Sequence, residues 1–150
     1  KLKRKGKKFQ IQIVGEGSKM NELQQAIAEK DLKSEVILMG KRMDVPALMA
    51  AAHCFLMPSL WEGMPITILE AGVSRLPIIS TPVGNISHLL KGERGYIAPI
   101  NEFPDQMQKV MDHYPAAILR SEKLYSHIKA HFSLDSSYQK LIELYTKALG

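Results

Sequence analysis

Two glutamates, Glu62 and Glu70, flank the start of a helical pattern at Pro65 in the middle of the chain. The apolar run at residues 55–58 just before them is typical of a buried strand. Backbone amides at a helix start lack intrahelical partners and can receive an anion. Carboxylates on either side of that start can accept hydrogen bonds from hydroxyl groups. A nucleotide sugar presents both kinds of group, so the spacing indicates a site for such a ligand.

The helix expected over residues 65–74 must position these groups. Proline fits its first position, where no amide donor is needed. Helical side chains lean towards the N-terminus, so Glu70 would point back towards the anion site. We expect the amides to come from Met64, Ile66 and Thr67. We expect a buried face formed by Ile66, Leu69 and Val73, and a polar stripe formed by Thr67, Glu70 and Ser74.

A simpler interpretation of the two carboxylates remains open. Glu62 could be a solvated loop acid, and Glu70 could be a surface acid favoured by the helix dipole. Two glutamates at this spacing are a weak pattern by themselves. The combination of Glu62, Gly63 and Pro65 between an apolar strand and an apolar helix is more specific.

Short, continuous apolar runs alternate with helical patterns over most of the chain. Uniformly apolar strands separated by helices are typical of parallel strands covered on both faces. The predicted fold class is therefore α/β, a Rossmann-like parallel sheet with helices on both faces and a helical C-terminal segment. Strands are expected at residues 9–14, 36–39, 54–57, 77–80 and 96–98. Helices are expected at residues 18–30, 44–52, 65–74, 86–90, 102–113, 115–130 and 134–149.

Local signals refine the helix ends. Ser18, Asp44 and Ser133 are suitable N-caps for three of the helices. The last helix carries an apolar stripe, which we expect to pack on the sheet or on a neighbouring domain. The stripe consists of Leu141, Leu144, Tyr145 and Leu149.

The composition fits one soluble globular domain, with 150 residues of which 45% are hydrophobic. A single cysteine, Cys54, excludes an internal disulfide and favours a reducing compartment. We find no secretory signal and no membrane-spanning apolar run. The expected location is the cytoplasm, with the inner face of the cell membrane as a peripheral alternative.

The net charge of +5 arises in the first eight residues, six of which are Lys or Arg. We therefore separate a basic arm, residues 1–8, from a folded domain, residues 9–150. The arm could be a solvated segment end, or it could be attracted to an anionic membrane surface. Nucleic-acid binding is disfavoured because no aromatic residues are interleaved for stacking.

Residues 58–71 resemble the signature of glycosyltransferase family 4, the group 1 glycosyltransferases. Further resemblances follow in the family's order at residues 13–17, 39–49, 76–84 and 92–97, so they cover about residues 9–113. The resemblance implies the C-terminal half of a GT-B fold, in which a cleft separates two Rossmann-like domains. This chain would be the nucleotide-sugar donor-binding domain, and an N-terminal acceptor domain would lie outside it.

The resemblance also implies an activity. Such enzymes transfer a hexose from a nucleotide sugar to a glycan or glycolipid with retention of configuration, as in polysaccharide or lipopolysaccharide biosynthesis. We expect a UDP-sugar donor, with GDP and ADP as alternatives, and no metal or other cofactor. The chain alone is expected to be inactive, because the acceptor domain and the phosphate-binding cations of the family would lie upstream. The alternatives are a GT-B relative, such as a sugar-nucleotide epimerase or sugar-phosphate synthase, and a non-catalytic nucleotide-binding module.

The family's pattern assigns residues to the donor. Glu62, the candidate catalytic residue, would contact hydroxyls of the donor sugar, and Glu70 would contact the ribose. Lys41 and Arg42 would lie near the base, or they could be solvated loop charges. The other implied donor-binding residues are Gly15, Gly17, Gly63, Met64, Pro65, Ile66 and Thr67.

The sequence departs from the family at several positions. Arg75 stands where a glycine usually ends the helix, so it must adopt a left-handed conformation or end the helix differently. Asn85 stands where a second glycine is common, and asparagine tolerates positive φ best among the other residues. His88 and His53 stand where acids are common; we expect a solvated or capping role for His88 and a structural role for His53.

Overall fold

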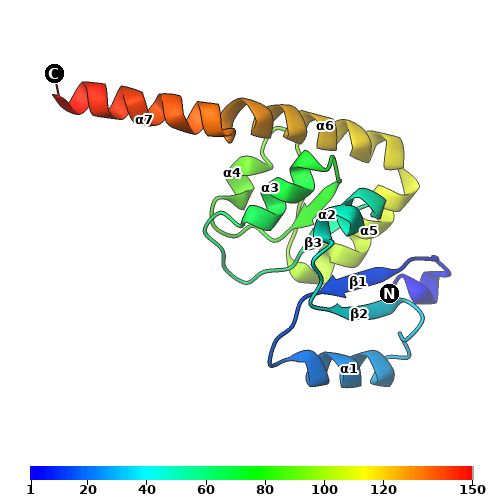
Figure 1. The fold of residues 1–150 in the computed structure, drawn as a ribbon. Helices are drawn as coiled ribbons and strands as arrows, with labels where there is room; N and C mark the ends of the chain where they lie inside the picture. Colours follow the sequence, from blue (N-terminus) through cyan, green and yellow to red (C-terminus); the bar gives the residue numbers. More distant parts are fainter. Residues whose placement is uncertain (150) are drawn as a thin grey trace. The chain divides into compact units, whose positions relative to one another are not determined.

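A computed structural model describes residues 1–149 of the chain (Figure 1). It divides into two compact units, residues 1–48 and the residues from 49 onward. The helix α2, Val45–Ala51, spans the boundary between them. Each unit carries its own strands, and each is described by itself below.

The first unit contains one parallel pair of strands joined by a helix. The strands are β1, Ile11–Val14, and β2, Val36–Gly40, and the helix between them is α1, Met20–Glu29. Ile11 pairs with Val36, and the ladder continues to the carboxyl ends of both strands. There the amide of Gly15 donates to the carbonyl of Gly40 at 2.8 Å. The two loops that follow these strands therefore start side by side.

The start of the basic arm is held against this unit. A short 3₁₀ helix, η1, covers Lys3–Lys5, and the side chain of Leu2 before it is only 4% exposed. The ammonium of Lys3 lies 3.0 Å from a carboxylate oxygen of Asp31 and 3.3 Å from one of Glu35. Burial and ion pairing therefore anchor this part of the arm, while Lys1, Arg4 and Lys5 remain exposed.

The second unit contains a parallel three-stranded sheet in the order β3, Phe55–Met57; β4, Ile78–Ser80; and β5, Tyr96–Ile97. Ile78 and Ile79 are both fully buried on β4. Successive residues of a strand point to opposite faces, so both faces of this sheet are covered. Ile79 packs in a core cluster with Tyr96, Phe103, Val110 and Ala117, and buried residues such as Ile68, Ile86 and Leu89 lie outside this cluster.

The helices of the second unit follow the strands and then fill the C-terminal part (Figure 1). Both α3 and α5 contact the sheet, and each also contacts α6. The helical elements are α3, Ile66–Val73; α4, Ile86–Leu89; the 3₁₀ helix η2, Ile100–Glu102; α5, Phe103–Asp112; α6, Tyr114–His131; and α7, Leu134–Leu149.

The α/β class, the parallel strands and the helical C-terminal segment are confirmed. The hydrogen bonds differ from the expectation of one sheet, because they join β1 to β2 and β3, β4 and β5 to one another. Apolar runs identify strands but do not say which strands pair. The Ser133 cap is also confirmed, since its hydroxyl accepts from the amide of Ser136 at 3.1 Å. The Ser18 cap is wrong, because α1 starts at Met20 and Lys19 takes the cap position.

The apolar stripe of α7 lies on the surface. No residue of α7, all of which the structure describes, is buried. The side chains of Leu141, Leu144 and Tyr145 are 52%, 69% and 63% exposed, and Leu149 is 87% exposed. The expectation that this stripe packs on the sheet is therefore wrong, whereas packing on a neighbouring domain stays a prediction. Within residues 1–149, no helix combines the length and apolar character that crossing a membrane requires.

Candidate functional site

The loop at residues 58–65 links β3 to α3 and carries most of the predicted site. Pro65 has φ −70° and ψ 129°, so it is the N-cap of α3 and not the first helical residue. The extended ψ keeps the proline just outside the helix, so the helix begins one residue later than expected. Because Ile66 begins the helix, its amide and that of Thr67 belong to the first turn, whose amides lack intrahelical partners.

The buried face of α3 differs from the expected one. Ile66 is 71% exposed and Val73 is 54% exposed, whereas Ile68 and Ala71 are completely buried. Close approach of α6 explains this orientation. A Cβ atom added at Gly72 would lie 2.3 Å from the Cδ1 atom of Ile128 on α6. The face with Ile68, Ala71 and Gly72 therefore packs inward, because its two small residues let α6 approach closely.

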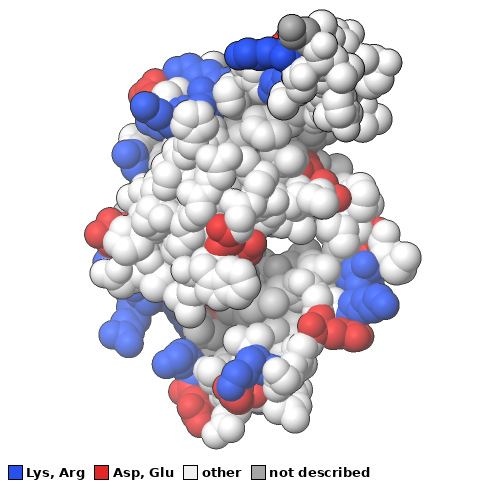
Figure 2. All heavy atoms as spheres, turned by 90° about the vertical axis from the view of Figure 1, so that its left-hand side faces the viewer, with Lys and Arg blue, Asp and Glu red and all other residues white. Residues whose placement is uncertain are grey.

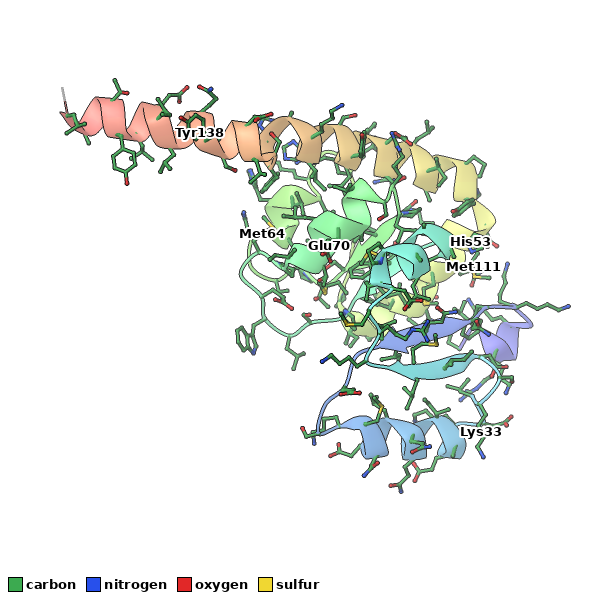
Figure 3. All side chains as sticks on the ribbon, viewed as in Figure 1. Lys33, His53, Met64, Glu70, Met111 and Tyr138 are labelled. Carbon is green, nitrogen blue, oxygen red and sulfur yellow. The ribbon has the colours of Figure 1, made fainter. Side chains whose placement is uncertain are left out.

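The predicted polar groups lie on the open side of α3. Thr67 and Glu70 are both exposed, and Glu70 follows the helix start by one turn (Figure 3). Met64, just before the helix, is half-buried. A negative group near these amides would meet the positive end of the helix dipole. The segment thus presents amide donors and a carboxylate on the same short stretch of chain.

Glu62 is held by its own loop. The hydroxyl of Ser59 donates to Oε1 of Glu62 at 2.9 Å, and the amide of Asn85 donates to the carbonyl of Gly63 at 3.1 Å. Glu62 is half-buried and Gly63 is exposed. Two apolar neighbours, Leu60 and Trp61, are 85% and 84% exposed. The carboxylate therefore sits in a defined orientation beside an apolar tip.

The remaining predicted residues lie in the first unit, at the carboxyl ends of β1 and β2. Gly15 has φ 132°, a conformation that side chains rarely allow, and it follows β1 directly. Gly17 follows two residues later and accepts a hydrogen bond from the amide of Met20 at 3.1 Å. Lys41 follows β2 and is exposed. These residues form one group, and the Glu62–Glu70 segment forms another in the second unit.

Arg42 has a partner that the sequence reasoning missed. Its Nε and Nη2 atoms donate to the two carboxylate oxygens of Asp44, at 2.8 and 2.6 Å. The hydrogen bond from Arg42 is the main cause that lowers the pKa of Asp44 below its ordinary value. A bidentate pair of this kind orients both side chains. Asp44 also accepts backbone hydrogen bonds at the start of α2, from Ala47 at 3.0 Å and Leu48 at 3.1 Å.

The departures from the family have local explanations. Arg75 adopts the left-handed conformation, with φ 56°, as one of the two expected alternatives. Asn85 has φ −84°, so the positive φ of this turn falls on Gly84 alone and no asparagine is needed for it. His53 packs its ring edge against Tyr114 at 5.7 Å between centroids, and His88 is exposed on α4.

Charged side chains of both signs lie on the exposed surface. Figure 2 shows Lys and Arg side chains interspersed with Asp and Glu on the face that it draws. Among the described residues, ion pairs such as Lys19 with Glu22 and Arg42 with Asp44 bring the two signs together. In the Glu62–Glu70 segment, the groups that could receive an anion are the amides at the start of α3.

Parallel strands that alternate with helices and end on glycine-containing loops define a Rossmann-type α/β architecture. The family model described as "Glycosyl transferases group 1" matches residues 1–113. The chain belongs to this family.

Two relatives show where the similarity extends. A UDP-Gal:alpha-D-GlcNAc-diphosphoundecaprenol alpha-1,3-galactosyltransferase of Escherichia coli is 33% identical over 138 residues, which cover 89% of this chain. The lipopolysaccharide core biosynthesis mannosyltransferase LpsB of Rhizobium meliloti is 25% identical over 131 residues, 83% of this chain. The chain spans only 35% and 37% of these two relatives.

Solved structures confirm the fold. HepE of Anabaena in complex with UDP superimposes with a TM-score of 0.85 at 20% identity, over 93% of this chain and 41% of HepE. HepE in complex with UDP-glucose gives 0.83 at 21% identity, over 92% and 41%. The fold of this chain thus matches part of the GT-B glycosyltransferases.

Proposed function

We propose that this chain is the donor-binding domain of a retaining glycosyltransferase that moves a sugar from a UDP-sugar to a glycan or glycolipid. The observation that carries the proposal is the segment from Glu62 to Glu70. It combines an oriented carboxylate, free amides at a helix start and a second, exposed carboxylate. Membership of the family and the UDP ligands of HepE support the choice of donor.

Each group has a task in this proposal. The amides at the start of α3 receive the diphosphate, and the helix dipole stabilises the charge that develops on it as the nucleotide leaves. Glu70 accepts hydrogen bonds from the ribose hydroxyls. Glu62 accepts from a hydroxyl of the sugar through the oxygen that Ser59 does not use. The bond from the anomeric carbon to the phosphate breaks, the bond to the acceptor oxygen forms, and a phosphate oxygen of the donor takes the acceptor's proton.

The loops after β1 and β2 carry residues for which we also propose contacts with the donor. Gly15 and Gly17 would let backbone approach the donor closely, and Lys41 would lie near the base. Arg42 would act there only in competition with Asp44, its partner in the structure. Groups for the acceptor would come from outside residues 1–150. We also propose a cytoplasmic location, with the inner face of the cell membrane as the peripheral alternative, where exposed cations of the basic arm such as Arg4 would meet anionic lipids.

An amide NMR titration of the chain with UDP, UDP-glucose, GDP and ADP tests the donor site. We expect shifts at residues 63–67 with the uridine ligands. Glu70→Ala should weaken UDP binding roughly ten-fold, because hydrogen bonds to a charged group are lost. Glu143→Ala, which removes an exposed acid from α7, is the matched control and should leave binding unchanged.

Two outcomes would contradict the proposal. One is the absence of shifts at residues 63–67 at millimolar UDP or UDP-glucose. The other is equal affinity of Glu70→Ala and the unaltered chain. Stronger shifts with GDP or ADP would support the same donor site but would show that the donor base is guanine or adenine and not uracil.

A further inference from the structure

A row of hydrogen bonds links the end of β4 to the carboxylate of Glu62. The hydroxyl of Thr81, which is 6% exposed, donates to the backbone carbonyl of Ser59 at 2.6 Å. The hydroxyl of Ser59 then donates to Oε1 of Glu62 at 2.9 Å. Thr81 thus holds the backbone of Ser59, and the side chain of Ser59 holds the carboxylate.

The position of Thr81 is itself fixed. Its amide donates to the carbonyl of Met57 at 3.1 Å, which extends the pairing of β3 and β4 by one residue. The hydroxyl also lies 3.3 Å from the same carbonyl, but the shorter contact identifies Ser59 as its main acceptor. The row therefore starts directly after β4, all three residues of which are buried.

The turn that follows β4 also supports the backbone at Glu62. Gly84 has φ 51°, and a Cβ atom added there would lie 1.8 Å from the carbonyl oxygen of Glu62. The amide of the next residue, Asn85, donates to the carbonyl of Gly63 at 3.1 Å. The turn after β4 therefore fixes both the main chain and the side chain of the Glu62 loop.

We propose that Ser59 and Thr81 are positioning residues that orient the Glu62 carboxylate for a hydroxyl of the donor sugar. This inference rests on the proposed function for the identity of the ligand. Without this hydrogen bond the half-buried Glu62 side chain would populate several rotamers, and a ligand would have to select one of them. With Oε1 held by Ser59, the other oxygen faces a ligand in a defined direction.

A purely structural role predicts something different. Thr81 is buried, so its hydroxyl also has a structural role as a donor to the backbone carbonyl of Ser59. If that were its whole function, its loss would lower stability and weaken UDP and UDP-glucose equally. Positioning predicts a loss confined to the ligand that carries the sugar.

The test uses the 150-residue chain and two readouts. Three-bond couplings give the χ1 rotamer populations of Glu62 without any ligand, and calorimetry gives the affinities for UDP and UDP-glucose. The variants are Ser59→Ala, Thr81→Val and the rescue Thr81→Ser, which restores a hydroxyl. Ser121→Ala is the control, since the hydroxyl of Ser121 is buried and donates to the carbonyl of Ile118 at 2.8 Å on α6.

We expect Ser59→Ala to average the Glu62 rotamers and to weaken UDP-glucose roughly two- to ten-fold, with UDP affinity unchanged. Thr81→Val should act in the same direction, and Thr81→Ser should restore the original behaviour. Ser121→Ala should change neither readout.

A single Glu62 rotamer retained in Ser59→Ala would overturn the inference, as would equal losses for UDP and UDP-glucose. Because Ser59 lies in a loop and is only half-buried, this variant decides the matter even if Thr81→Val does not fold. The unaltered chain could bind neither UDP nor UDP-glucose while Ser59→Ala still averages the Glu62 rotamers. That result would support the orientation of Glu62 by Ser59 but would overturn the proposed function.

Discussion

At the residue scale, Arg75 shows how a non-glycine residue can occupy a left-handed helix end. A left-handed conformation costs roughly 1–2 kcal/mol for such a residue. Two contacts offset part of that cost. The Nε atom lies 3.0 Å from a carboxylate oxygen of Glu122, and the guanidinium lies 4.0 Å from the ring centroid of Tyr125. Both partners are on α6, so Arg75 also ties the end of α3 to that helix.

This balance gives a stability prediction. Arg75→Ala keeps the left-handed strain and loses both contacts, so we expect it to lower the free energy of unfolding by about 1 kcal/mol. Arg75→Gly loses the same contacts but relieves the strain, so it should be within about 0.5 kcal/mol of the unaltered chain. Urea denaturation measures both values. A glycine variant less stable than the alanine variant would contradict this account.

At the element scale, the sequence predicted the strands and helices well because apolar runs and caps are local signals. The Glu62–Glu70 segment could likewise be found from residue types and spacing. The orientation of α3 could not, because it depends on Gly72 and on how closely α6 approaches. The row from Thr81 to Ser59 was also missed, since hydrogen bonds between loops 22 residues apart leave no pattern in the sequence.

The C-terminal end of α6 carries a group of three neighbouring rings. The rings of His127 and His131 have centroids 4.6 Å apart, and Phe132 lies 6.0 Å from His127. Burial, followed by the charges of Arg94, His131 and His88, lowers the pKa of His127 below the ordinary value of 6.5. The folded chain therefore binds a proton at His127 less readily than the unfolded chain does.

A pH dependence follows, with a definite sign. Where the unfolded state binds more protons, stability rises with pH. The contribution of His127 is thus fully present above pH 6.5 and is lost as the pH falls through the lower pKa of the folded state. We expect His127→Gln to reduce the loss of stability between about pH 7 and pH 5, measured by urea denaturation at each pH. His113→Gln, which removes an exposed histidine, should keep the original slope, and an unchanged slope in His127→Gln would refute the assignment.

At the scale of the whole molecule, this chain is much shorter than the glycosyltransferases that it resembles. The chain covers 35% of the E. coli galactosyltransferase and 41% of HepE. Under the proposed function, this domain supplies the donor groups, and acceptor groups from elsewhere complete the transfer. Binding and transfer are therefore separate measurements: the first belongs to residues 1–150 and the second to the complete protein.

Glu62 connects the two measurements. In the complete enzyme we expect Glu62→Gln to lower kcat/KM for a UDP-sugar roughly 10- to 100-fold, because a hydrogen bond to a charged group becomes one to a neutral amide. UDP alone should bind the variant as before, since Glu62 is proposed to contact only the sugar. Glu143→Gln on α7 serves as the control for a lost surface charge. Unchanged transfer in Glu62→Gln would show that Glu62 has no role in the reaction. Weaker UDP binding would show that Glu62 contacts the nucleotide and not only the sugar.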